Sequence, residues 1–234
     1  MTSSTSPTKH TVVVLVLDKS GSMAGDREAV IVGFNEQIQT LKQHAGAAGE
    51  TAVSLVTFSD PSSIETVFAH RTAAEAVELT AASYRPNGST ALFDAIDHGI
   101  DLAQTHPHYQ EEGTAVLLLT FTDGQENASS RVTAKRLGAR IRELEASGRW
   151  TVTLLGPDGV QQTAKHLAMR ENNVMVMPMH TRAGKTEAFT SMGVSTASFM
   201  GRRGAGERGS MDFYGDEKRR RALRKAPPGT PAKP

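Results

Sequence analysis

The sequence predicts an α/β protein, a doubly wound, Rossmann-like three-layer sandwich built on about six mostly parallel strands. Apolar runs alternate along the chain with segments whose apolar residues recur at helical spacing, as in a parallel sheet covered by helices on both faces. The run over residues 114–122 is continuously apolar, which indicates a central strand buried on both faces. Residues 51–58 and 64–69 flank a tight turn, so we expect the second of these strands to return antiparallel at the sheet edge.

The remaining elements follow from the same patterns. The first strand is expected over residues 11–17, and two later ones over 150–155 and 174–177. A first helix is expected to begin after Asp26 as its cap and to end near residue 44, because apolar residues recur four, four and three positions apart at Val30, Phe34, Ile38 and Leu41. Further helices are expected from about Ala91, around 134–144, over 160–168, and over about 186–200 with Thr186 as its cap.

The chain divides by composition into a polar tail (residues 1–10), one domain (11–200) and a basic tail rich in Gly, Arg, Pro and Lys (201–234). This last segment holds ten Lys or Arg against four Asp or Glu, and residues 201–209 have a composition that rarely packs. Its basic run begins at Lys218 and ends at Lys225, and it is the one segment for which we consider nucleic acid binding. Phe213 and Tyr214 are expected to dock on the domain or on a partner.

Composition sets the broad class. The chain has 234 residues and no cysteine, so it carries no disulfide, no thiolate metal site and no cysteine nucleophile. No stretch approaches the roughly 18 consecutive apolar residues that a membrane span needs. The first ten residues lack the apolar core of a secretory signal. We therefore expect a soluble cytoplasmic protein.

Oxygen-bearing side chains follow three of the predicted elements. Asp18, Ser20 and Ser22 come directly after the first strand, Thr90 stands at the start of the second helix, and Asp123 follows the central strand. Because parallel strands end at one edge of the sheet, these side chains should converge there. Two carboxylates and three hydroxyls suit a hard divalent cation, Mg²⁺ or Mn²⁺.

These motifs together resemble a known family. Asp-x-Ser-x-Ser after the first strand, a Thr after a Gly-Ser loop, and Thr122-Asp123-Gly124 after a long apolar strand are similar to the metal-ion-dependent adhesion site of von Willebrand factor A domains. The resemblance covers about residues 10–200. It implies that Ser20, Ser22 and Thr90 ligate the cation, while Asp18 and Asp123 act directly or through water. Finer features, among them Phe34-Asn35, residues 123–129 and Leu155-Gly156, are similar to stand-alone bacterial members.

The resemblance implies a function in binding rather than catalysis. Neutral hydroxyls leave the cation electrophilic, so an Asp or Glu of a partner protein, or of a second copy, could complete its coordination. One alternative is a regulatory subunit that docks on an ATPase or a modifying enzyme. A metal-dependent hydrolase is disfavoured, because no general base or nucleophile accompanies the ion.

Other motifs point to weaker possibilities. A phosphotransferase of the haloacid dehalogenase type needs a second Asp where this chain has Ser20. Residues 184–186 end like a phosphate-binding loop but lack its leading glycine, and residues 204–209 fit G-x-G-x-x-G without following a strand. His106 and His108 form the one close histidine pair, and no third ligand stands at metal spacing, so a solvated loop is expected.

Overall fold

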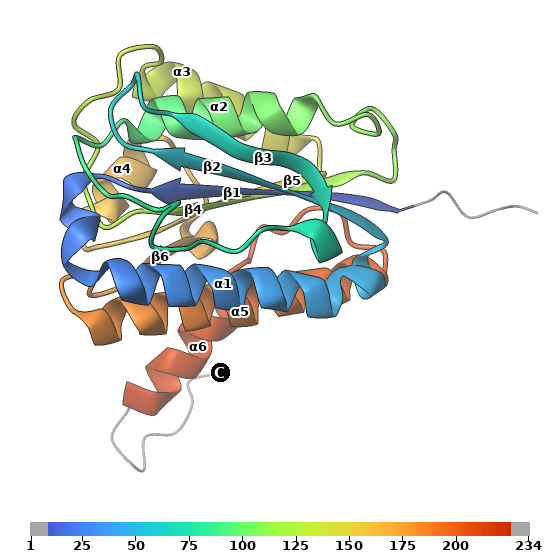
Figure 1. Ribbon diagram of the computed structural model, residues 1–234. Helices are drawn as coiled ribbons and strands as arrows, with labels where there is room; N and C mark the ends of the chain where they lie inside the picture. Colours follow the sequence, from blue (N-terminus) through green and yellow to red (C-terminus); the bar gives the residue numbers. More distant parts are fainter. Residues whose placement is uncertain (1–8, 226–234) are drawn as a thin grey trace, which may run out of the picture.

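The computed structural model describes residues 9–225, and its centre is a six-stranded sheet in the order β3-β2-β1-β4-β5-β6 (Figure 1). Every neighbouring pair is parallel except β2 and β3. The predicted fold class is therefore confirmed, including the antiparallel edge strand. The strands are β1 (His10–Asp18), β2 (Glu50–Phe58), β3 (Glu65–Thr72), β4 (Ala115–Phe121), β5 (Trp150–Gly156) and β6 (Val174–Val176).

Helices cover both faces of this sheet (Figure 1). The longer helices α1 and α5 pack against each other on one face, while α2, α3 and α4 lie on the other. The helices are α1 (Arg27–His44), α2 (Leu92–Gln104), α3 (Ala134–Ala146), α4 (Val160–His166), α5 (Arg182–Gly204) and α6 (Gly215–Lys225), with 3₁₀ turns at η1 (Gly21–Asp26), η2 (Ala45–Ala48), η3 (Ala73–Glu75) and η4 (Glu171–Asn173).

The central strand β1 supplies both cores. All nine of its residues are buried. Val13 and Leu15 pack with α1 and α5, whereas Val12 and Val14 pack with α2 and α3, because successive side chains on a strand point to opposite faces. A side chain at Gly33 of α1 would overlap the Phe189 ring of α5, so this glycine permits the close approach of the two helices.

The C-terminal part differs from the prediction. The helix expected over 186–200 begins at Arg182 and continues to Gly204, and within residues 201–209 the Arg203 side chain packs into the domain while most of the others are exposed. Arg203 is almost fully buried, and its Nη2 donates to the carbonyl oxygens of His10 (3.1 Å) and Gly113 (3.0 Å). The composition of residues 201–209 did not predict this burial, because the Arg203 guanidinium donates to buried backbone carbonyls rather than facing water.

Phe213 and Tyr214 dock on the domain, which is one of the two alternatives expected from the sequence, the other being a partner. Both side chains are buried with the core beneath α1 and α5, and the Tyr214 backbone N–H donates to the Asn172 carbonyl (2.7 Å). Helix α6 follows, so the basic run is helical rather than an extended tail. Arg221 pairs with Glu187 of α5 at 2.6 Å, which ties this run to the domain. The rest of the predicted tail, residues 226–234, lies outside the described residues, as do residues 1–8 of the predicted N-terminal tail.

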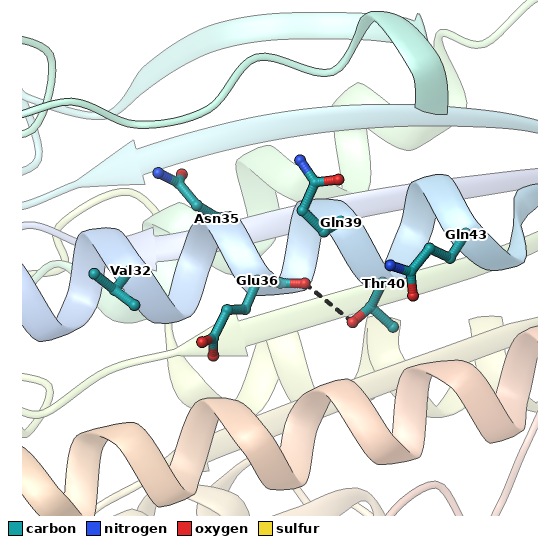
Figure 2. Close-up of a pocket in the computed structure, with 6 residues that line it drawn as sticks. All are labelled: Val32, Asn35, Glu36, Gln39, Thr40 and Gln43. Atoms are coloured by element: carbon teal, nitrogen blue, oxygen red, sulfur yellow. Dashed lines mark hydrogen bonds between the residues drawn. The ribbon is translucent and has the colours of Figure 1, made fainter.

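Two further observations concern a membrane span and a hollow on the surface. Within residues 9–225, no helix is long and apolar enough to cross a membrane. An open hollow of about 450 Å³ lies along α1 and is lined by six residues between Val32 and Gln43, whose side chains are drawn in Figure 2. All of its lining side chains come from this one helix, and Thr40 Oγ1 donates back to the Glu36 carbonyl. Two of these side chains, Asn35 and Gln39, already bond to Leu79 and Glu78, so we do not treat the hollow as a candidate site.

Candidate metal centre

Asp18 ends β1 at the carboxyl edge of the sheet, and its side chain is fully buried. Its Oδ1 accepts the Ser20 backbone N–H at 2.6 Å, and its Oδ2 accepts the Thr122 hydroxyl at 2.5 Å. Burial raises the pKa of Asp18 to about 6, although hydrogen bonds from Thr122 and Ser20 favour the ionised form. A bound cation would offset this cost of burying the carboxylate.

The structure brings the five predicted site residues together. Ser20 Oγ and Ser22 Oγ lie 3.1 Å apart, and Ser22 Oγ donates to Asp123 Oδ1 at 2.5 Å. A Cβ atom at Gly124 would lie 3.0 Å from Thr90 Oγ1 and 3.6 Å from Ser22 Oγ, so the hydroxyls of Thr90 and Ser22 both lie beside Gly124. Ser22 is exposed whereas Ser20 and Thr90 are buried, so the cluster faces solvent on the Ser22 side.

Backbone hydrogen bonds hold the three loops in place. The Gly21 N–H donates to the Gly88 carbonyl (3.0 Å), which joins the loop after β1 to the loop before α2. Asn127 closes the other side, because its Oδ1 accepts the Thr90 N–H (2.9 Å) and its own N–H donates to the Thr90 carbonyl (3.1 Å). The convergence of hydroxyls and carboxylates is therefore built into the loop conformation.

The donor set fits a small hard cation. All five side chains offer oxygen, the ligand type that Mg²⁺ and Mn²⁺ prefer. Neighbouring ligands of an octahedral Mg²⁺, each about 2.1 Å from the ion, lie about 3.0 Å apart. Ser20 Oγ and Ser22 Oγ, now hydrogen-bonded at 3.1 Å, are close enough to contact one ion. Ser20, Ser22, Thr90, Asp18 and Asp123 could thus hold such an ion.

One charged residue of this site does not follow from the sequence pattern. Lys185 of α5 is buried, and its Nζ lies 2.7 Å from Asp123 Oδ2 and 3.5 Å from Asp26 Oδ2. Asp26 stands at the N-cap position of α1 as expected, although its side chain makes no capping hydrogen bond. The cap expected at Thr186 was wrong, because α5 is capped by Thr181, whose hydroxyl accepts the Gly184 N–H at 3.0 Å. An apolar residue pattern cannot reveal a lysine that turns inward to an ion pair.

Tyr84 supports the floor of the site. Its hydroxyl donates to the Asp18 carbonyl oxygen at 2.5 Å, and its ring is fully buried. Burial raises the pKa of this phenol above its ordinary value, with further contributions from the nearby charges of Asp18 and Asp123. Tyr84 therefore acts as a neutral donor that fixes the end of β1.

These features define a class of protein: an α/β domain whose carboxyl sheet edge carries a cluster of hydroxyls and carboxylates suited to a divalent cation. The von Willebrand factor type A domain family matches residues 13–182, most of the chain. The chain therefore belongs to this family. No curated protein matches it.

Solved structures of low sequence identity share the fold. The pilus adhesin SpaC from Lactobacillus rhamnosus GG is 15% identical with a TM-score of 0.60, and the match covers 83% of this chain and 31% of that one. The PilB minor pilin from Streptococcus sanguinis is 10% identical with a TM-score of 0.57, and the match covers 82% of this chain and 62% of that one. Proximal thread matrix protein 1 from the mussel byssus is 18% identical with a TM-score of 0.50, and the match covers 81% of this chain and 46% of that one. In that structure the metal-ion-dependent adhesion site (MIDAS) motif is occupied by zinc. This chain thus matches less than two thirds of each of these proteins.

Proposed function

We propose that this chain binds a partner protein through a divalent cation, Mg²⁺ or Mn²⁺, held by the five site residues. A carboxylate of the partner, from an Asp or a Glu, would complete the coordination on the exposed Ser22 side. The observation that carries the proposal is the composition of the site: three neutral hydroxyls, and a carboxylate at Asp123 that is already paired with Lys185.

Electrostatics explains why such a site favours an acidic ligand. An ammonium 2.7 Å from Asp123 Oδ2 neutralises much of that carboxylate's charge. Asp18 then remains as the main compensating anion, and its oxygens also accept hydrogen bonds from Ser20 and Thr122. A doubly charged cation in this setting keeps excess positive charge, so it attracts a carboxylate from outside.

We favour binding over catalysis. The basic side chain at the site, Lys185, is engaged by two carboxylates and so is poorly suited to accept a proton. A regulatory subunit that docks on an ATPase or a modifying enzyme would use the same contact with a particular partner. Self-association would use it with an acidic residue of a second copy. The stand-alone bacterial setting and the cytoplasmic location stay predictions.

The proposal is tested by affinity capture from host lysate with three samples: the wild type with Mg²⁺, the wild type with EDTA, and Asp18→Ala with Mg²⁺. A partner retained by the first sample alone supports the metal bridge. Its binding should then be lost when the acidic residues at its contact surface are changed one at a time to amides. The same set of proteins in all three samples would refute the proposal.

A further inference from the structure

A second cluster of candidate metal ligands lies at the opposite edge of the sheet. His10 begins β1, and His108 and Glu111 lie in the loop between α2 and β4 (Figure 1). One ligand atom from each of the three lies within 4.8 Å of the other two. The nine residues of β1 separate His10 from Asp18 by about 26 Å at about 3.3 Å per residue, so this cluster is independent of the metal centre.

Glu111 joins the two imidazoles on one side. The rings of His10 and His108 are stacked with centroids 4.0 Å apart and an interplanar angle of 2°. Glu111 Oε1 lies 2.6 Å from His108 Nδ1, and its Oε2 lies 3.2 Å from His10 Nε2. The two oxygens of one carboxylate thus face one nitrogen of each ring.

His10 is also oriented from its other ring nitrogen. The parallel register of β1 and β2 pairs His10 with Glu50, and His10 Nδ1 lies 3.4 Å from Glu50 Oε2. A carboxylate on the far nitrogen is the usual partner of a metal-ligating histidine, because it fixes the tautomer that leaves the near nitrogen free. His10 is itself buried in the strand, so its ring has a fixed position.

The loop that carries the other two ligands is held by its own contacts. The Glu111 N–H donates to the His108 carbonyl (3.1 Å), which also accepts the Thr114 hydroxyl (2.5 Å). Arg149 Nη1 donates to the Glu111 carbonyl at 3.1 Å. The three candidate ligands therefore meet without rearrangement of the backbone.

We propose that His10, His108 and Glu111 form a second metal site, selective for Zn²⁺ or a similar late first-row divalent cation. Two imidazoles and one carboxylate are an established set of three protein ligands for zinc, whereas the hydroxyl-rich centre at the other edge suits harder ions. The side chains of His108 and Glu111 are 45% and 50% exposed, which leaves the remaining coordination position open to water or an external ligand. Each imidazole binds the cation through one nitrogen and carries its proton on the other.

His106, although close, is not part of the set. Its Nδ1 accepts the His108 backbone N–H at 3.3 Å, so its proton lies on Nε2. The Nδ1 lone pair of His106 is therefore engaged by the loop backbone rather than directed at the other ligands.

The test is calorimetric titration of the full chain with ZnCl₂ in excess Mg²⁺, which keeps the other centre filled. His108→Gln and Glu111→Gln should each weaken Zn²⁺ binding by more than about 100-fold, and Glu50→Gln by about 10-fold, as for a residue that positions a ligand. His166→Gln, an exposed histidine on α4, is the matched control and should leave the affinity unchanged. Circular dichroism establishes that each variant is folded.

A fourth variant separates the two metal sites. Asp18→Asn disables the centre at the carboxyl edge, so full Zn²⁺ affinity in this variant supports the proposal. Zinc should also shift the imidazole nitrogen resonances of His10 and His108 but not that of His166. Zn²⁺ binding that is absent from the wild type, lost in Asp18→Asn, or unchanged in His108→Gln and Glu111→Gln would overturn it.

Discussion

Substitution of Lys185 by methionine should destabilise the metal-free protein and strengthen its response to Mg²⁺. The ion pair with Asp123 is buried, with side chains 3% and 5% exposed. Removal of one partner from a buried pair costs about 3–5 kcal/mol, because the other charge is left uncompensated. For a chain of this length, a loss of this size lowers the melting temperature by about 6–20 °C.

Magnesium should recover part of this loss. Without the Lys185 ammonium, the Asp123 carboxylate keeps its full negative charge and becomes a stronger ligand. The cation then makes the electrostatic interaction that Lys185 made before. Recovery of about 1.4 kcal/mol corresponds to a tenfold gain in Mg²⁺ affinity for Lys185→Met over the wild type. The same change should weaken partner binding, because the bound cation is then better neutralised.

The assay is urea unfolding with EDTA and with saturating Mg²⁺. Lys165→Met, at an exposed position on α4, is the matched control and should behave as the wild type. The double variant Lys185→Met with Asp123→Asn should regain stability in EDTA while losing the response to Mg²⁺. Equal stabilisation of Lys185→Met and the wild type by Mg²⁺, or no loss of stability in EDTA, would refute the reasoning.

Three other predictions follow from the geometry. Gly124→Ala brings a methyl within 3.0 Å of Thr90 Oγ1, so calorimetry should show about tenfold weaker Mg²⁺ binding and an unchanged fold; full affinity would contradict the crowding. Phe213→Ala removes a buried ring that packs near Phe199 and should cost about 3–5 kcal/mol in urea unfolding, whereas a loss under about 1 kcal/mol would contradict its core role. Mg²⁺ at 100 times its Kd should stabilise the wild type by about 2.7 kcal/mol and leave Asp18→Ala unchanged; an equal response would be contrary evidence.

The convergence of the five candidate ligands was predictable because their positions follow from strand topology. Asp18 ends β1 and Asp123 lies two residues beyond the neighbouring parallel strand β4, so the convergence of their loops depends only on the order of the sheet. Lys185 escaped prediction because its position depends on how α5 packs against α1. A helical apolar pattern gives the buried face of a helix, but not the partner of a charged side chain near its first turn.

The C-terminal segment and the histidine cluster show a second limit. Arg203 and the glycines around it have the composition of a tail. Arg203 nevertheless donates hydrogen bonds to the carbonyls of His10, at the start of β1, and Gly113, both distant in sequence. His10 lies beside Glu50 because β1 and β2 start at the same end of the sheet, and it lies beside His108 because the loop before β4 reaches that end too. Contacts of this kind become visible when the fold is known, since no local spacing encodes them.

The proposed function requires a divalent cation at Asp18, and Mn²⁺ paramagnetic resonance tests for this ion most directly. Titration of the full chain with Mn²⁺ should show a single bound ion that Mg²⁺ displaces in the wild type, and no such ion in Asp18→Ala. The same displaceable Mn²⁺ in Asp18→Ala, or none in the wild type, would contradict the proposed metal centre.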